Sequence, residues 1–236
     1  MLHHAMVQVA IIIPVYNEEE IIRKNIGALA HFCSGLKGKY RIIIVDNGST
    51  DATSDYGKQL SREFSSVSYL RVNKKGKGRA IKQGLKKVDS PWYMLMDCDL
   101  PTPITYLRKI EKLIASKQYD LIVGNRHDKE SKLHAGMLRR IISKSYIFLA
   151  QTALGMSIPD LQGGFKAWNQ KVKKEIFPLC KDEEWFLDTE LLYFSHKKGL
   201  RVLYTPIEYT INSGSSVHIF SDSARFFSNL FKLRQR

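Results

Sequence analysis

The chain has 236 residues, and its 44% hydrophobic and 25% charged residues are ordinary for one large globular domain. Its 37 lysines and arginines outnumber 23 acidic residues and give a formal net charge of +14, which predicts an anionic partner: nucleic acid, an anionic membrane surface or a phosphorylated substrate. The three cysteines lack disulfide or zinc-site spacing, and no run of about 18 apolar residues predicts a bilayer-spanning helix. We also expect no cleavable signal, so contact with a membrane is expected only at its surface.

The first half of the chain alternates short β-branched runs with segments of helical spacing. Strands are expected over 9–15, 40–45, 67–72, 92–96 and 121–123. Helices are expected over 18–32, through Gln59, after Gly76 and over 106–116. This alternation predicts an α/β fold: a mostly parallel sheet flanked by helices, with functional loops beyond the carboxyl ends of the strands.

The second half is less regular. A helix is expected over 137–154, a glycine-bearing loop over 160–166 and a helix over 186–195. A strand over 202–209 and a basic terminal helix over 220–236 complete the prediction.

Asp97-Cys98-Asp99 follows the apolar run of residues 92–96, where a buried strand is expected to end. Two carboxylates in this place do not belong to the core, because burying unpaired charge is costly. Oxygen ligands at this spacing suit a divalent cation that also holds a diphosphate. The alternative is a solvated turn, and the other motifs of the chain decide against it.

Five motifs occur in order, each at a predicted loop: Pro14-Val-Tyr-Asn-Glu, Val45-Asp-Asn-Gly-Ser-Thr-Asp, Asn73-Lys-Lys-Gly-Lys-Gly, Asp97-Cys-Asp and Asp188-Thr-Glu. Over about residues 7–215 they resemble glycosyltransferase family 2, an inverting group with the Rossmann-like GT-A fold. Further segments are similar to the polyprenyl-phosphate sugar synthases, which include dolichyl-phosphate mannose synthases and dolichyl-phosphate β-glucosyltransferases: Gly124-Asn-Arg, Arg139-Arg-Ile-Ile-Ser-Lys, Asp160-Leu-Gln-Gly-Gly-Phe-Lys and Gly214-Ser-Ser-Val. The resemblance implies a GT-A domain over 1–215. A basic amphipathic helix over 216–236 is expected to pack on this domain or lie at a membrane surface.

The resemblance assigns a donor site to the first half of the chain. It implies that Asp97 and Asp99 bind Mg²⁺ or Mn²⁺, which acts as a Lewis acid on the departing diphosphate. Asp46 is expected to accept hydrogen bonds from a uracil or guanine edge, with a helix cap as the alternative. The implied nucleotide-binding residues are Pro14, Tyr16, Glu18, Asp46, Lys77, Gly78 and Asp97. Lys77 and Gly78 are expected to bring backbone N–H groups near the nucleotide, or else form a plain turn.

Two positions depart from the family pattern. Asn47 replaces the second acidic residue usual after Asp46, which affects ribose or base recognition. Pro101 stands where the mannose synthases carry a glutamine metal ligand, so a third protein ligand is missing at this place.

The acceptor site is expected in the second half. Asp188 matches the general base of relatives that glycosylate hydroxyls, but a lipid phosphate is already ionised near pH 7, so we expect Asp188 to position the acceptor pocket. Arg126, Arg139 and Ser143 are the candidates for binding the acceptor phosphate, with Arg140 as the substitute. Gln162, Gly163 and Gly164 are expected near the donor sugar, and Trp185 either at the acceptor or in the core.

The leading hypothesis is a metal-dependent inverting transferase that moves a hexose from UDP-glucose or GDP-mannose to polyprenyl (dolichyl) phosphate. The glucosyltransferase-like segments favour UDP-glucose. One alternative keeps the fold but glycosylates a hydroxyl of a glycan or lipid. The remote alternatives are a non-enzymatic nucleic-acid-binding module and a catalytically inactive scaffold.

Two segments are predicted to be basic and amphipathic: residues 147–149 with the arginines that precede them, and residues 225–236. Each is expected to lie in a membrane interface or to pack its apolar side on the core. The net charge favours peripheral attachment, which we expect on the cytoplasmic face of a membrane, and leaves room for a membrane-protein partner.

Overall fold

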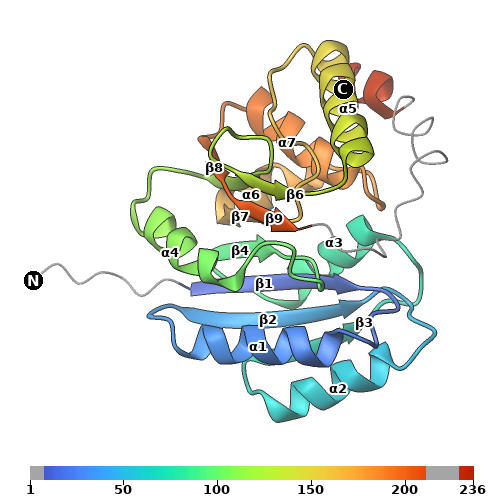
Figure 1. Ribbon diagram of the computed structural model, residues 1–236, viewed down its shortest axis with the longest axis vertical. Coiled ribbons are helices and arrows are strands. Elements are labelled where there is room, and N and C mark those ends of the chain that lie inside the picture. The colour runs from blue at the N-terminus through green and yellow to red at the C-terminus, as the bar shows by residue number, and fades with distance from the viewer. Residues whose placement is uncertain (1–7, 211–228) are drawn as a thin grey trace, which may run out of the picture.

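The structure, a computed structural model, describes residues 8–210 and 229–236, and within these ranges seven strands form the central sheet in the order β3-β2-β1-β4-β7-β5-β8 (Figure 1). The strands are β1 Gln8–Val15, β2 Lys39–Asp46, β3 Val67–Arg71, β4 Trp92–Leu95, β5 Leu121–Asn125, β7 Lys166–Asn169 and β8 Val202–Pro206. All neighbouring strands are parallel except β7, which runs antiparallel to both β4 and β5. The predicted mostly parallel α/β fold is therefore confirmed.

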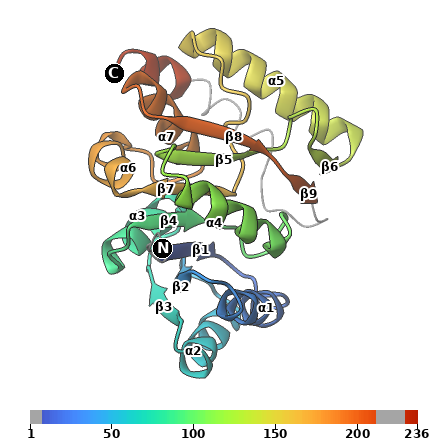
Figure 2. The ribbon, with the colours of Figure 1, turned by 90° about the vertical axis from the view of Figure 1, so that its left-hand side faces the viewer.

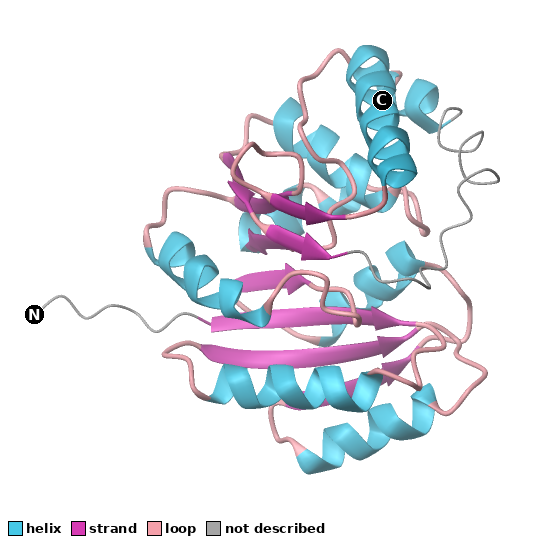
Figure 3. Ribbon diagram, viewed as in Figure 1, coloured by secondary structure: helices cyan, strands magenta, loops and turns pink. Residues whose placement is uncertain are grey.

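Helices cover both faces of this sheet (Figure 3). They are α1 Ile22–Ser34, α2 Thr53–Glu63, α3 Lys77–Lys87, α4 Leu107–Ala115, α5 Met137–Leu154, α6 Gln170–Glu175 and α7 Leu187–Lys197, with short 3-10 turns η1 Ile104–Tyr106 and η2 Phe177–Leu179. Successive side chains of β1 point to opposite faces, as the period of a strand requires. Ile11 and Ile13 belong to the core cluster that includes residues of α1, α2 and α4, whereas Ile12 belongs to the cluster that includes residues of α3, α5, α6 and α7. Such a continuous apolar run is what a strand covered on both faces needs.

The strand order reverses at β1. We call the region beyond the carboxyl ends of β1, β2 and β4 the crevice. From β1 the chain moves outward to β2 and β3, and it then returns to place β4 on the other side of β1. Ligands of open α/β sheets bind beyond the carboxyl ends of strands at such a reversal. The loops that follow β1, β2 and β4 all end there.

A second, two-stranded sheet pairs β6 Lys132–His134 with β9 Glu208–Thr210 (Figure 2). The predicted single strand over 202–209 is wrong, because the chain leaves the central sheet after Pro206 and joins β6 instead. Thr210 N–H then donates to the Pro101 carbonyl at 2.8 Å, which brings β9 against the loop after β4.

At three further places the structure differs from the prediction or describes only part of the predicted element. The helix expected from residue 18 begins at Ile22, because residues 18–21 form a turn bonded to the loop after β2. β7 and α6 were not predicted, since a four-residue strand carries too short a pattern. Of the terminal helix expected over 220–236, the structure describes 229–234 as helical; Arg225, Phe226, Phe227 and Gly214 lie outside the described residues.

The described C-terminal segment packs on the domain. Leu230 and Leu233 are buried in the core beside α7. Arg236 Nη1 donates to Glu190 Oε1 at 2.6 Å, and the other oxygen of this buried carboxylate accepts from the Asp182 N–H at 2.7 Å.

Replacing Arg236 by alanine should lower the free energy of unfolding by about 1–3 kcal/mol, because it leaves a buried carboxylate oxygen without its partner. Chemical denaturation with urea measures this, and Arg234→Ala is the matched control, because Arg234 is exposed on the same turn. Equal stability of the two variants would contradict the importance of the pair.

Candidate active site

Three acidic side chains gather where β1 and β4 end. Asp97 and Asp99 follow β4, and Glu18 comes from the turn after β1. Burial and the nearby charges of Asp99 and Asp97 raise the pKa of Glu18 to about 7. Burial and Asp97 likewise raise the pKa of Asp99 to about 6. The crevice therefore holds an excess of negative charge that a cation would relieve.

One ammonium group offsets part of this charge. Lys77, the first residue of α3, places its Nζ 2.7 Å from Asp97 Oδ1 and 4.5 Å from the centre of the Trp185 ring. Burial lowers the pKa of Lys77, but the charges of Asp97 and Asp188 outweigh it and raise that pKa to about 12. Lys77 is thus a fixed positive charge in the crevice at every physiological pH.

The start of α3 differs from a free phosphate-binding loop. The Gly78 and Arg79 N–H groups donate to the carbonyls of Glu184 and Glu183 at 3.1 and 2.9 Å, and the Gly76 N–H donates to Asn47 Oδ1 at 2.8 Å. The Gly78 N–H group, which is expected near the nucleotide, therefore already has an acceptor within the chain. The group of α3 that reaches the carboxylates is the side chain of Lys77.

Asp46 is completely buried at the end of β2. Its Oδ1 accepts from the Ser49 N–H at 2.8 Å, and its Oδ2 accepts from Tyr69 Oη at 2.6 Å and Arg71 Nη1 at 2.8 Å. The carboxylate therefore shapes the loop after β2, and each oxygen has a protein donor. Its contact with a nucleotide base stays a prediction.

The turn after β1 is bonded to the loop after β2. The Glu18 N–H donates to Thr53 Oγ1 at 2.7 Å, and the Thr50 N–H donates to Asn17 Oδ1 at 2.9 Å. The half-buried Tyr16 ring has Lys75 Nζ 3.9 Å from its centre. Pro14, which is also half-buried, is the last but one residue of β1. The predicted nucleotide residues thus lie on four segments at one end of the sheet: the end of β1 with the turn after it, the end of β2, the start of α3 and the loop after β4.

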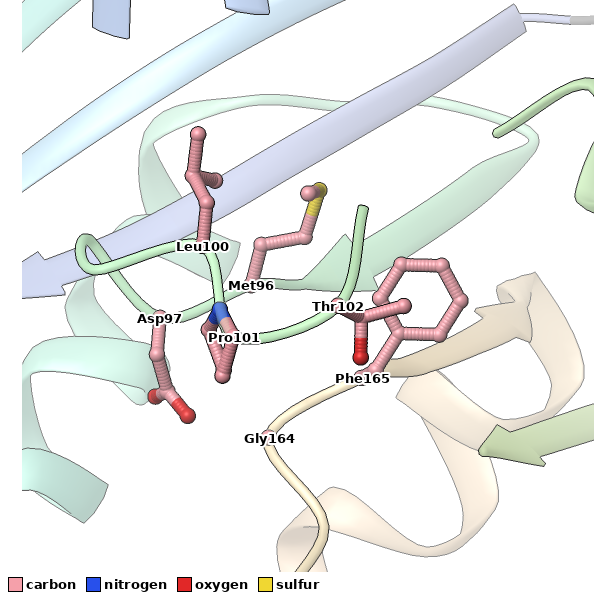
Figure 4. Close-up of a pocket in the computed structure, with 7 residues that line it drawn as sticks. All are labelled: Met96, Asp97, Leu100, Pro101, Thr102, Gly164 and Phe165. Carbon is pink, nitrogen blue, oxygen red and sulfur yellow. The ribbon is translucent and has the colours of Figure 1, made fainter. Parts of the chain in front are cut away.

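The glycine loop before β7 closes against Asp97, as Figure 4 shows. A shallow pocket between them is lined by Met96, Asp97, Leu100, Pro101, Thr102, Gly164 and Phe165. A Cβ atom on Gly164 would lie 1.7 Å from Asp97 Oδ2, so only glycine fits. Gly163 lies beside the Asp160 carboxylate, and the Gln162 N–H donates to Asp160 Oδ1 at 3.3 Å. The three predicted donor-sugar residues therefore lie on a loop held between Asp97 and Asp160.

Asp188, in the first turn of α7, forms a buried ion pair. Lys166 Nζ donates to Asp188 Oδ1 at 2.8 Å, and side-chain exposure is 0% for the lysine and 5% for the aspartate. The same ammonium donates to the Gly163 carbonyl. The sequence did not assign a role to Lys166, although a lysine inside the apolar run 165–168 signals a buried partner.

The predicted acceptor residues Arg139, Arg140 and Ser143 lie in the first half of α5, and Arg126 lies just after β5. Three of these four residues have partners in the chain. Arg126 uses both arms of its guanidinium on Asp160, with Nε–Oδ2 and Nη2–Oδ1 distances of 2.8 Å. Ser143 Oγ lies 3.0 Å from His127 Nε2. Arg140 donates to the carbonyls of Ala135 and Leu133. Arg139 lies in α5, but its side chain is outside the described part of the structure.

Comparisons with known proteins agree with this geometry. The model of glycosyl transferase family 2 matches residues 10–177. A dolichyl-phosphate beta-glucosyltransferase of Dictyostelium discoideum is 28% identical over 98% of this chain and 75% of that protein. The Saccharomyces cerevisiae protein of the same name is 26% identical over 95% of this chain and 73% of its own.

A solved structure shows a similar fold. The glucosyl-3-phosphoglycerate synthase from Mycobacterium tuberculosis, in complex with Mn²⁺, uridine diphosphate and glucosyl-3-phosphoglycerate, superposes with a TM-score of 0.74. The match covers 98% of this chain and 80% of that chain at 14% identity, so it concerns the fold alone.

Gly164→Ala should reduce turnover by at least about 100-fold, because the new methyl group must push the Asp97 carboxylate out of place. Steady-state kinetics measure the loss, and Gly27→Ala, whose Cβ would meet nothing within 4 Å, is the control. Normal turnover in Gly164→Ala would show that Asp97 need not stay where it lies.

Asp99→Asn should stabilise the metal-free protein at pH 7.5 while destroying its activity. The pKa of Asp99 is raised on folding, from 3.8 to about 6, so ionising this group costs stability progressively as pH rises through that window. We expect a gain of about 1 kcal/mol at pH 7.5, after allowance for solvent screening, that vanishes below pH ~4. Thermal melts in chelator measure it, with the exposed Glu63→Gln as control; a destabilised Asp99→Asn would contradict the charge crowding.

Proposed function

The chain belongs to glycosyl transferase family 2, and we propose that it transfers a hexose to polyprenyl or dolichyl phosphate with inversion of the anomeric configuration. The proposed donor is UDP-glucose, in preference to GDP-mannose. The observation that carries the proposal is the charge pattern of the crevice. Carboxylates crowd its donor side at Asp97, and an ion pair neutralises Asp188 on its acceptor side. The names of the two relatives, matched over nearly the whole of this chain, support glucose as the transferred sugar and dolichyl phosphate as the acceptor.

The residues present fit a divalent cation shared with a diphosphate. Among the described residues no three His, Cys, Asp or Glu side chains are grouped to hold a metal ion by themselves. Asp97 and Asp99 would supply two oxygens, and the substrate would complete the shell, as Mg²⁺ and Mn²⁺ permit. Such a cation, when bound, stabilises the charge that develops on the departing nucleoside diphosphate. The complex of the mycobacterial neighbour with Mn²⁺ and uridine diphosphate supports this choice.

The chain's own residues contribute charge and placement. Lys77 holds Asp97 in place and adds a positive charge beside the diphosphate path. Gly164 leaves room for that carboxylate, so the donor is held between the loop after β4 and the glycine loop. An acceptor oxygen then attacks the anomeric carbon from the side opposite the diphosphate, the old carbon–oxygen bond breaks, and the configuration is inverted.

The acceptor is proposed to be a lipid phosphate because Asp188 is already paired. A hydroxyl acceptor needs a base to take its proton, and a carboxylate bonded to a buried ammonium is a poor base. A lipid monophosphate has a second pKa near ~6, so its oxygen is already charged at neutral pH. Arg139 and Ser143 on α5 stay our candidates for binding this phosphate, while Arg126 anchors the glycine loop through Asp160.

Peripheral attachment to the cytoplasmic face of a membrane is part of the proposal. None of the helices within 8–210 and 229–236 combines the length and apolarity that crossing a bilayer requires. Large apolar side chains are exposed along α5 and on the C-terminal segment that lies beside it (Figure 1): Met137, Ile141, Phe148, Leu149 and Phe231. Such side chains beside basic residues suit the interface of an anionic membrane.

A donor panel tests the proposal. Purified protein is given radiolabelled UDP-glucose or GDP-mannose, polyprenyl phosphate in detergent, and Mn²⁺ or Mg²⁺. We expect UDP-glucose to label a lipid that mild acid releases, with activity falling at least about 100-fold in chelator because the diphosphate loses its counter-ion.

Asp99→Asn is the inactive control of this experiment. An acid-stable labelled product would identify a hydroxyl acceptor instead. Full turnover in chelator, or no labelled lipid with any donor, would refute the proposal.

A further inference from the structure

Lys166 is one of the largest completely buried side chains of the protein. It begins β7, where it pairs with Leu95 of β4 on one side and Val123 of β5 on the other. A lysine at the centre of a sheet, walled by apolar strands, is costly unless its ammonium is fully bonded. Its two acceptors are the Gly163 carbonyl and the Asp188 carboxylate, so it joins the glycine loop to α7.

Asp188 lies between the donor and acceptor sides of the crevice. On the donor side, Lys166 joins Asp188 to the Gly163 carbonyl, and the next residue, Gly164, lies against the Asp97 carboxylate. On the acceptor side, the neighbouring Thr189 Oγ1 lies 3.0 Å from Tyr146 Oη of α5. An unpaired carboxylate at this place would repel a phosphate that approaches along α5.

We propose that Lys166 is a positioning residue that neutralises Asp188 and thereby selects an ionised acceptor over a hydroxyl. This inference rests on the proposed function and deepens it by assigning the choice of acceptor class to one buried pair. The pair contributes no net charge, so a phosphate dianion is not repelled. It also withholds the carboxylate from the proton transfer that a hydroxyl acceptor requires.

The test compares four variants with wild type at pH 8, using UDP-glucose and polyprenyl phosphate. Lys166→Met removes the ammonium and keeps the side-chain length, and Lys166→Arg keeps the charge. Asp188→Asn removes the carboxylate, and the double variant Lys166→Met/Asp188→Asn restores neutrality. Lys173→Met is the matched control, since Lys173 also pairs with an aspartate, Asp89 at 3.3 Å, but the side chain of this aspartate is 85% exposed.

Lys166→Met should lower kcat/KM by at least about 100-fold, mainly through a higher KM for polyprenyl phosphate, because it leaves a buried carboxylate unpaired. The KM for UDP-glucose should change by less than about threefold. Asp188→Asn and Lys166→Arg should each stay within about tenfold of wild type, and the double variant should recover at least about tenfold over Lys166→Met.

Three results would overturn the inference. A loss above about 10³-fold in Asp188→Asn alone would make that residue a general base. A double variant no better than Lys166→Met would make the pair merely structural. A double variant that fails to fold would also make the pair merely structural. A pair that acts only by being neutral can be replaced by two neutral side chains.

Failure of the proposed function can be told apart from failure of this inference. In that case wild type itself transfers no sugar to polyprenyl phosphate, and the variants have no reference rate. If Lys166→Met is too unstable to assay, the folded double variant alone decides: activity within about tenfold of Asp188→Asn supports the inference, and inactivity overturns it.

Discussion

Negative charge is crowded into one end of the sheet, and most of the crevice is organised around that constraint. Burial and neighbouring carboxylates raise the pKa values of Glu18 and Asp99. Among the described side chains, Lys77 is the one that forms an ion pair with this cluster, through Asp97. Carboxylates arranged in this way lower the stability of the empty protein. Such a cluster is typical of a site where a divalent cation, bound together with a diphosphate, neutralises the carboxylates.

Three buried or partly buried ion pairs surround this charge. Lys77–Asp97 joins α3 to the loop after β4, Arg126–Asp160 joins the loop after β5 to the glycine loop, and Lys166–Asp188 joins β7 to α7. The glycine loop runs between all three, and Gly164 touches the Asp97 carboxylate. Because each pair is hydrogen-bonded and largely buried, movement of one loop is coupled to the charges beside it.

The fold, and the placing of the predicted carboxylates at one end of the sheet, were predictable from the sequence because their signals are local. The apolar run of β4 and the carboxylates after it stand next to each other in the chain, and strand-end loops of parallel strands share one edge. The partners of the predicted residues were not predictable. Lys166 and Asp188 are 22 residues apart, and Arg126 and Asp160 are 34 apart, so only the folded chain pairs them.

The same reason explains the remaining differences. The carbonyls of Glu183 and Glu184 accept from the N–H groups of Arg79 and Gly78 at the start of α3, an arrangement that no local pattern encodes. β7 enters the sheet against the direction of its neighbours, and its insertion is what buries Lys166. The family motifs thus indicate which residues surround the crevice, while tertiary packing determines which of them are already bonded.

The most direct measurement of the central claim is a Mn²⁺ titration, followed by electron paramagnetic resonance, in the presence and absence of uridine diphosphate. If two protein carboxylates share the ion with a diphosphate, Mn²⁺ should bind weakly alone and at least about tenfold more tightly with the nucleotide. Equal affinity under both conditions, or no Mn²⁺ bound with uridine diphosphate present, would contradict the account.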